Sequence, residues 1–199
     1  GTHSVFSYNN IKLISVHVTS FQPGQTSVTE RGFPVAIVLV TSERESIHTC
    51  IASILSASVP EWKPRLLMTD MAFSAYNGWS KLFPDLKWLW CVFHVWQAWI
   101  RRLRSMPNGG GFDKDTWSHV KGRLIKEVKD LISPKSEMTS EEFKTCSGLI
   151  EDLLHAVGES EIAALWASYR SQASHWALHE RWAAIRSIFP EANQLPMLA

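Results

Sequence analysis

The stretch that decides the fold is residues 65–103, where two short apolar runs each end in a polar motif. Residues 65–70 read Arg-Leu-Leu-Met-Thr-Asp, and residues 89–94 read Leu-Trp-Cys-Val-Phe-His. Short apolar runs bounded by polar residues are typical of buried strands. A carboxylate at the end of such a strand lies in the crevice that an open α/β sheet leaves for ligands. Asp70 is therefore the first candidate site residue, and Cys91 and His94 are the next.

The residues around this stretch alternate between strand and helix patterns. Residues 11–18 and 33–41 are apolar and β-branched, so we expect two neighbouring antiparallel strands. Residues 42–56 have apolar side chains at helical spacing, with Ser42 as N-cap and Glu45 as its capping-box partner. Further strands are expected at 65–69 and 88–93, and further helices at 71–83 and 95–106. The fold class is therefore α/β, with helices packed on a sheet.

The second half of the chain has helical periodicity throughout. We expect helices at 117–133, 141–157, 159–173 and 176–189, with a break at Gly158. The glycine-rich residues 108–111 separate this half from the first. The sequence thus predicts a core at residues 1–106 and a helical insertion or subdomain at residues 107–199.

The order of motifs in the first half resembles the Mutator-like element (MULE) transposase domain of the DDE superfamily. In that family a Thr-Asp at a strand end supplies the second acid of the catalytic triad, and Thr69-Asp70 matches it. A Cys-x-x-His motif follows the next strand, and Cys91 and His94 match it. Residues 32–36, Gly-Phe-Pro-Val-Ala, resemble a further family motif. The resemblance covers about the first half of the chain.

The resemblance implies a ribonuclease-H-like mixed sheet and a catalytic site. It implies that Asp70 binds Mg²⁺, or Mn²⁺ in its place, and that Cys91 and His94 support the site and orient the substrate. The implied activity is DNA cleavage and strand transfer at transposon ends, which would take place in the nucleus. DNA is the implied partner, and the pattern is compatible with an oligomer.

The other two acids of the triad do not follow from the resemblance. Thr2-His3 matches the family's Thr-His, which puts the first catalytic Asp just before Gly1, so the first strand is expected to be missing. The nearest candidate for the third acid is Glu180, between Trp176 and Trp182, although an exposed helix glutamate is the alternative. With one acid of three, we expect an inactive fragment. The alternative is a degenerate or domesticated domain that binds DNA or protein without catalysis.

Each candidate residue also has a structural interpretation. Asp70 could instead cap the helix expected to begin at Met71. Cys91 could be a small buried side chain and His94 a hydrogen-bonding residue at a strand-to-helix junction. A zinc site would need four ligands, and the nearest other pair is His175 and His179, far along the chain, so zinc is disfavoured.

A basic cluster follows the Cys-x-x-His motif. Arg101, Arg102 and Arg104 could contact a DNA backbone, with Trp96 and Trp99 just upstream. The alternative is that the arginines lie on the solvent-exposed face of a helix and the tryptophans on its buried face. The chain has 20 Lys and Arg against 19 Asp and Glu, so a net charge of +1 gives little general attraction to phosphate. Nucleic-acid binding would therefore depend on a local patch of this kind.

Composition indicates a soluble globular protein. Apolar residues make up 45% of the chain, and no apolar stretch approaches a membrane span. The three cysteines are odd in number and scattered, which argues against a disulfide framework and for a reducing, intracellular environment. We therefore expect no membrane partner.

Overall fold

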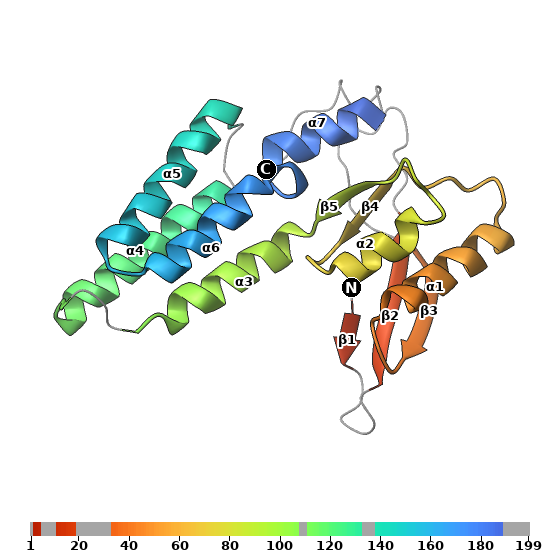
Figure 1. Ribbon diagram of the computed structural model, residues 1–199, viewed down its shortest axis with the longest axis horizontal. Helices are drawn as coiled ribbons and strands as arrows, with labels where there is room; N and C mark the ends of the chain where they lie inside the picture. Colours follow the sequence, from red (N-terminus) through yellow and green to blue (C-terminus); the bar gives the residue numbers. More distant parts are fainter. Residues whose placement is uncertain (1, 5–10, 19–32, 108–110, 133–137, 189–199) are drawn as a thin grey trace. The chain divides into compact units, whose positions relative to one another are not determined.

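The computed structural model describes residues 2–4, 11–18, 33–107, 111–132 and 138–188 (Figure 1). Strands and helices alternate in the first half, and the second half is helical, which confirms the α/β class. The described residues form two compact units. One holds the residues up to Trp88 together with 186–188, and the other holds Leu89–Ile185.

Three strands of the first unit form an antiparallel sheet in the order β1-β2-β3. They are β1 (Thr2–Ser4), β2 (Lys12–Val18) and β3 (Phe33–Val40). The predicted antiparallel pair is confirmed, with Ile14 opposite Val38. The register shifts between Val16 and His17, where the partner changes from Ala36 to Pro34. Proline lacks the N–H that a regular ladder needs, which accounts for an irregularity at this point.

Helix α1 (Glu45–Ser58) packs on one face of this sheet. The core between them contains Ile14, Val40, Ile51, Ala52, Trp79, Phe83 and Leu86. The predicted start of this helix at Ser42 is wrong, because the N-cap is Arg44 and no side chain caps it. The carboxylate of Glu45 contacts Lys81 instead of the chain before the helix, so the capping box does not form.

The opposite face of β3 carries exposed apolar side chains. Phe33, Val35, Ile37 and Leu39 alternate along the strand and are all exposed, with Ile37 at 67% of its full accessibility. Val38 and Val40 point the other way, toward the core. The alternation follows from the period of two in a strand. Strand β3 is therefore apolar on both faces, and α1 packs on one of them.

The strands β4 (Leu66–Thr69) and β5 (Lys87–Trp90) form a second, two-stranded sheet. The described strands thus form two small sheets, whereas the sequence predicts one mixed sheet. Helix α2 (Phe73–Ser80) connects β4 to β5 and packs against α1. At Gly78 an added Cβ would lie 2.6 Å from the Cβ of His48 on α1. The absence of a side chain at Gly78 therefore permits this close approach.

The second unit is built from helices. They are α3 (Val92–Ser105), α4 (Lys114–Ile132), α5 (Ser140–Ala156), α6 (Ser160–Ser171), the 3₁₀ turn η1 (Ala173–His175) and α7 (Leu178–Ile188), whose last turn lies in the first unit. Gly158, between α5 and α6, has a φ of 80°, which explains the predicted break there. No helix among the described residues is long and apolar enough to cross a bilayer.

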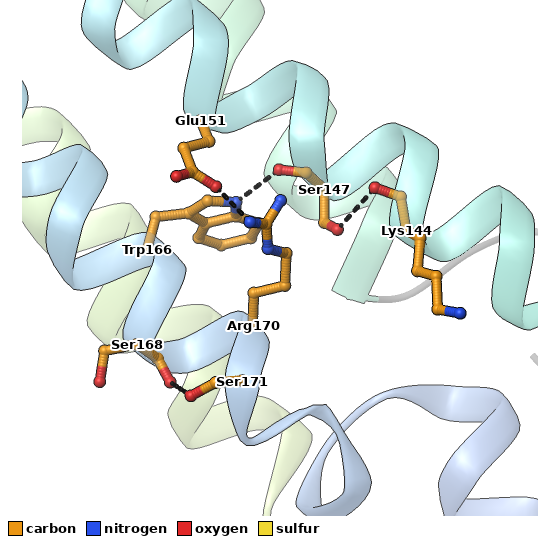
Figure 2. Close-up of polar contacts among 7 residues, drawn as sticks. All are labelled: Lys144, Ser147, Glu151, Trp166, Ser168, Arg170 and Ser171. Atoms are coloured by element: carbon orange, nitrogen blue, oxygen red, sulfur yellow. Dashed lines mark hydrogen bonds and ion pairs between the residues drawn. The ribbon is translucent and has the colours of Figure 1, made fainter.

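Tryptophan side chains fill the core of this unit. Trp99, Trp166 and Trp176 are almost fully buried, and the rings of Trp99 and Trp166 meet edge to face at 4.7 Å. The indole of Trp166 donates to the carbonyl of Ser147 at 2.8 Å, beside an ion pair of 2.7 Å between Arg170 and Glu151 (Figure 2). These contacts join α5 to α6. Packing thus explains much of the high tryptophan content.

Candidate active site

Asp70 lies in the turn between β4 and α2. Its Oδ1 accepts a hydrogen bond of 3.1 Å from the backbone N–H of Ala72. The hydroxyl of Thr69 donates to the carbonyl of Asp70 at 2.7 Å and accepts the indole N–H of Trp88 at 2.8 Å. The alternative role of Asp70 as N-cap of a helix starting at Met71 is wrong, because α2 begins at Phe73 and its N-cap is Ala72. The carboxylate is instead held by the turn that precedes the helix.

A buried histidine lies near this carboxylate. His48 on α1 is only 7% exposed. Burial lowers the pKa of its imidazole, and the charges of Glu43 and Asp70 oppose this shift. The two acids therefore lie close enough to act on the same ring. Glu43 is also paired with Lys12 at 2.9 Å, which neutralises part of its charge.

The described residues do not form a complete metal site around Asp70. Within the ranges that the structure describes, no three or more His, Cys, Asp or Glu side chains are grouped so that they could hold a metal ion. Mg²⁺ usually binds one or two carboxylates together with waters and substrate phosphates. The half-buried carboxylate of Asp70 is a chemically suitable single ligand, and the rest of a coordination sphere would have to come from elsewhere.

Cys91 and His94 lie at the start of α3. The predicted strand to Phe93 is too long, since β5 ends at Trp90 and α3 begins at Val92 with Cys91 as its N-cap residue. The thiol of Cys91 makes no capping bond. The Nδ1 atom of His94 is buried and has no hydrogen-bond partner among the described residues. Asp70 belongs to the first unit and these two residues to the second, so their clustering stays a prediction.

The second histidine pair lies among aromatic rings. His175 stacks on Trp90 with ring centroids 5.5 Å apart, and His179 lies 5.2 Å from the ring of Phe143. The three cysteines, Cys50, Cys91 and Cys146, are free thiols. These contacts give the histidines packing roles within the second unit.

The arginine cluster lies on the exposed part of α3. Arg101, Arg102 and Arg104 are all exposed, whereas Trp99 is 2% exposed and belongs to the core. Burial raises the pKa of the Tyr169 hydroxyl, and the nearby charge of Arg102 opposes this shift. Trp99 is thus unavailable for stacking on bases, while the guanidinium groups are accessible to phosphate.

Glu180 lies in the first turn of α7 and is half-buried. Its Oε1 lies 3.6 Å from Nε2 of His179. Glu180 belongs to the second unit, so its approach to Asp70 stays a prediction as well.

His48 is the residue near Asp70 that the sequence did not single out. It precedes Ile51 and Ala52 by three and four residues, which puts it on the buried face of α1. A histidine at a core position of an amphipathic helix was the signal that could have found it.

The comparison with family models supports the resemblance drawn from the sequence. Residues 5–98 match the model of the MULE transposase domain. The match includes Asp70, Cys91 and His94, and it ends before the arginine cluster and Glu180. Neither the curated proteins nor the solved structures contain a match to this chain.

Proposed function

Since residues 5–98 match the model of the MULE transposase domain, we propose that residues 1–106 are the ribonuclease-H-like core of a DDE transposase fragment. Residues 107–199 are then its helical insertion or subdomain. The observation that carries this proposal is the family match, with Asp70 at the β4–α2 turn inside it. The parent activity is DNA cleavage and strand transfer at transposon ends, in the nucleus.

In this proposal Asp70 is a ligand of a divalent metal, Mg²⁺ or Mn²⁺. Transposases of this kind use such ions to stabilise the charge of the attacking and leaving oxygens at the scissile phosphate. Asp70 supplies one carboxylate, and Cys91 and His94 at the start of α3 support the site and orient the DNA. Arg101, Arg102 and Arg104 contact the phosphate backbone, because their side chains are exposed on one helix.

The chain as it stands is inactive in this proposal. Two metal ions need carboxylates that converge from several elements, and Asp70 is the one catalytic acid that the motifs identify. Without two bound metal ions at the scissile phosphate, several kcal/mol of transition-state stabilisation are lost. The second candidate function is a degenerate domain that binds DNA without cutting it. The exposed arginines of α3 favour that candidate.

The test is incubation of the purified chain with DNA that carries terminal inverted repeats, in Mg²⁺ or Mn²⁺. The comparison is between the unmodified chain, Asp70→Ala, and Asp85→Ala as a matched exposed acid. We expect no cleavage by any of the three, and DNA affinity that falls steeply as salt rises. Calorimetric titration with Mn²⁺ then measures whether Asp70→Ala loses weak metal binding that Asp85→Ala keeps.

Two results would contradict parts of this proposal. Metal-dependent cleavage that disappears in Asp70→Ala and persists in Asp85→Ala would show that the chain is active and that other acids serve beside Asp70. Glu43 and Glu180 would then be the first residues to replace. The absence of any DNA binding at low salt would contradict both the transposase and the DNA-binding candidates.

A further inference from the structure

An exposed aromatic ring lies next to Asp70 in the first unit. Phe73 is the first residue of α2, three positions after Asp70, and 57% of its surface is accessible. Met68, the residue before Thr69 on β4, is also exposed, at 49%. A large apolar side chain at such exposure contributes little to the core. An exposed apolar side chain thus precedes Asp70 in the sequence and another follows it.

Phe73 packs on Trp88, which in turn stacks with Tyr76. Its ring meets that of Trp88 edge to face, with centroids 5.0 Å apart. Tyr76 stacks on Trp88 at 4.9 Å with the rings nearly parallel. Trp88 is 5% exposed, so it is a fixed support beneath the exposed ring. We call Phe73, Tyr76 and Trp88 the aromatic platform.

The aromatic platform is tied to Asp70 through Thr69. The indole N–H of Trp88 donates to the hydroxyl of Thr69 at 2.8 Å, and that hydroxyl donates to the carbonyl of Asp70 at 2.7 Å. Both bonds lie within one unit, and the carboxylate of Asp70 is itself held by the N–H of Ala72 at 3.1 Å, so local structure sets where the platform and the carboxylate lie. A group bound on Phe73 would therefore lie at a defined position beside Asp70.

We propose that Phe73 stacks on an unpaired base of the DNA strand whose backbone passes Asp70. This inference rests on the proposed function, because a nucleic-acid substrate supplies the base. Every base offers a flat π face to an aromatic ring, so stacking needs no particular sequence. The ring would fix the base of the nucleotide beside Asp70, whereas the carboxylate and the phosphate, both anions, attract one another only through a metal ion.

The test uses a DNA duplex with one unpaired 2-aminopurine, and the same duplex with an abasic residue at that position. Binding is measured in EDTA, so that no metal or cleavage is needed. We expect the unmodified chain to quench 2-aminopurine fluorescence and to bind the abasic duplex roughly fivefold or more weakly. Phe73→Leu should bind both duplexes alike, and Phe73→Trp should restore the preference.

The outcomes separate this inference from the proposed function. Equal binding of both duplexes by the unmodified chain, or an unchanged preference in Phe73→Leu, would overturn the stacking inference alone. Absence of binding to either duplex would overturn the proposed function and the inference with it. The unmodified chain can be tested on both duplexes without any variant. Its preference for the duplex with the base therefore tests stacking even if Phe73→Leu folds poorly.

Discussion

Gly78 is the residue on which the packing of α1 against α2 depends most directly. An added Cβ would lie 2.6 Å from the Cβ of His48, 2.7 Å from the carbonyl oxygen of Glu45 and 2.9 Å from the N of Thr49. Two of these three atoms belong to the backbone, so they cannot move aside as a side chain can. Because α2 follows the turn that holds Asp70, this contact also positions the candidate site.

Gly78→Ala is therefore expected to lower the free energy of unfolding by about 1–3 kcal/mol. Gly122→Ala on α4 is the matched control, since nothing lies within 4 Å of its added Cβ. That control should stabilise the protein by about 0.5–1 kcal/mol, because alanine restricts the unfolded chain. Urea unfolding of both variants measures the difference. Equal stability of the two variants would contradict the close contact.

The buried imidazole of His48 makes stability depend on pH. Burial lowers its pKa in the folded state, and the charges of Glu43 and Asp70 only oppose that shift. The unfolded chain therefore takes up the proton first, near its ordinary pKa of about 6.5. Stability is complete above about pH 6.5 and falls as the pH drops through the lowered pKa of the folded state.

His48→Gln should flatten this fall. We expect the unfolding free energy of the unmodified chain to decrease from pH 7 to pH 5 by more than that of the variant. At pH 8 the histidine is neutral in the folded and in the unfolded state. The difference in unfolding free energy between the two proteins at that pH therefore reports packing alone. A difference that stays constant from pH 8 to pH 5 would refute the role of His48.

At the scale of elements, Lys121 links α4 to the end of α3. Its ammonium group donates to the carbonyl oxygens of Met106 at 2.8 Å and Arg104 at 3.2 Å. The last carbonyls of a helix have no partner within it, and a cation also interacts well with that end of the helix dipole. Lys121 also lies 5.8 Å from the ring of Trp117. Lys121 therefore caps the end of α3 and lies against Trp117 of its own helix, α4.

Lys121→Met keeps most of the apolar stem and removes the charge. We expect a loss of about 1 kcal/mol in the free energy of unfolding, since two carbonyls lose a charged donor. Lys144→Met on α5 is the control, and it should change stability by less than about 0.5 kcal/mol. Figure 2 draws the Lys144 side chain pointing away from the Ser147 contacts. Thermal unfolding measures the stability of both variants. An equal loss of stability in Lys121→Met and Lys144→Met would refute the capping role of Lys121.

Periodicity predicted the existence and type of the elements better than their ends. The strands at 11–18 and 33–41 and the helices of the second half follow the apolar pattern, and the structure has them. Their boundaries depend on contacts that pattern does not reveal. Glu45 pairs with Lys81 rather than capping its own helix, and α3 starts at Val92, before the Cys-x-x-His motif ends.

The candidate site was predicted in part. The motif at Asp70 was readable because a strand end followed by an acid is a local feature. The sequence did not reveal the roles of His48 and the aromatic platform, because these depend on how α1, α2 and β5 pack in three dimensions. Convergence of carboxylates is likewise a tertiary property, which explains why Glu180 could only be named as a candidate.

At the scale of the whole molecule, strand β3 has one face packed on the core and one face of exposed apolar side chains. Phe33, Val35, Ile37 and Leu39 form the exposed face of β3. Contiguous apolar surface of this kind promotes association between chains, as does an edge strand with apolar side chains. We therefore expect the purified chain to self-associate as its concentration rises.

The double variant Ile37→Thr with Leu39→Thr should reduce this association at little cost in stability. Threonine keeps the strand propensity that β-branched residues provide, and both side chains are already exposed, at 67% and 60%. Val38→Thr is the matched control, because Val38 packs against the core and its replacement buries a hydroxyl. Sedimentation velocity across a range of concentrations measures association, and urea unfolding measures stability.

Each variant should change one of the two measured quantities. The exposed pair changes association and leaves the unfolding free energy nearly constant, whereas Val38→Thr lowers that free energy by about 1 kcal/mol or more. This contrast is possible only if neighbouring residues of one strand face different environments, as the period of two requires. Association that persists in the double variant would mean that another surface of the molecule drives it.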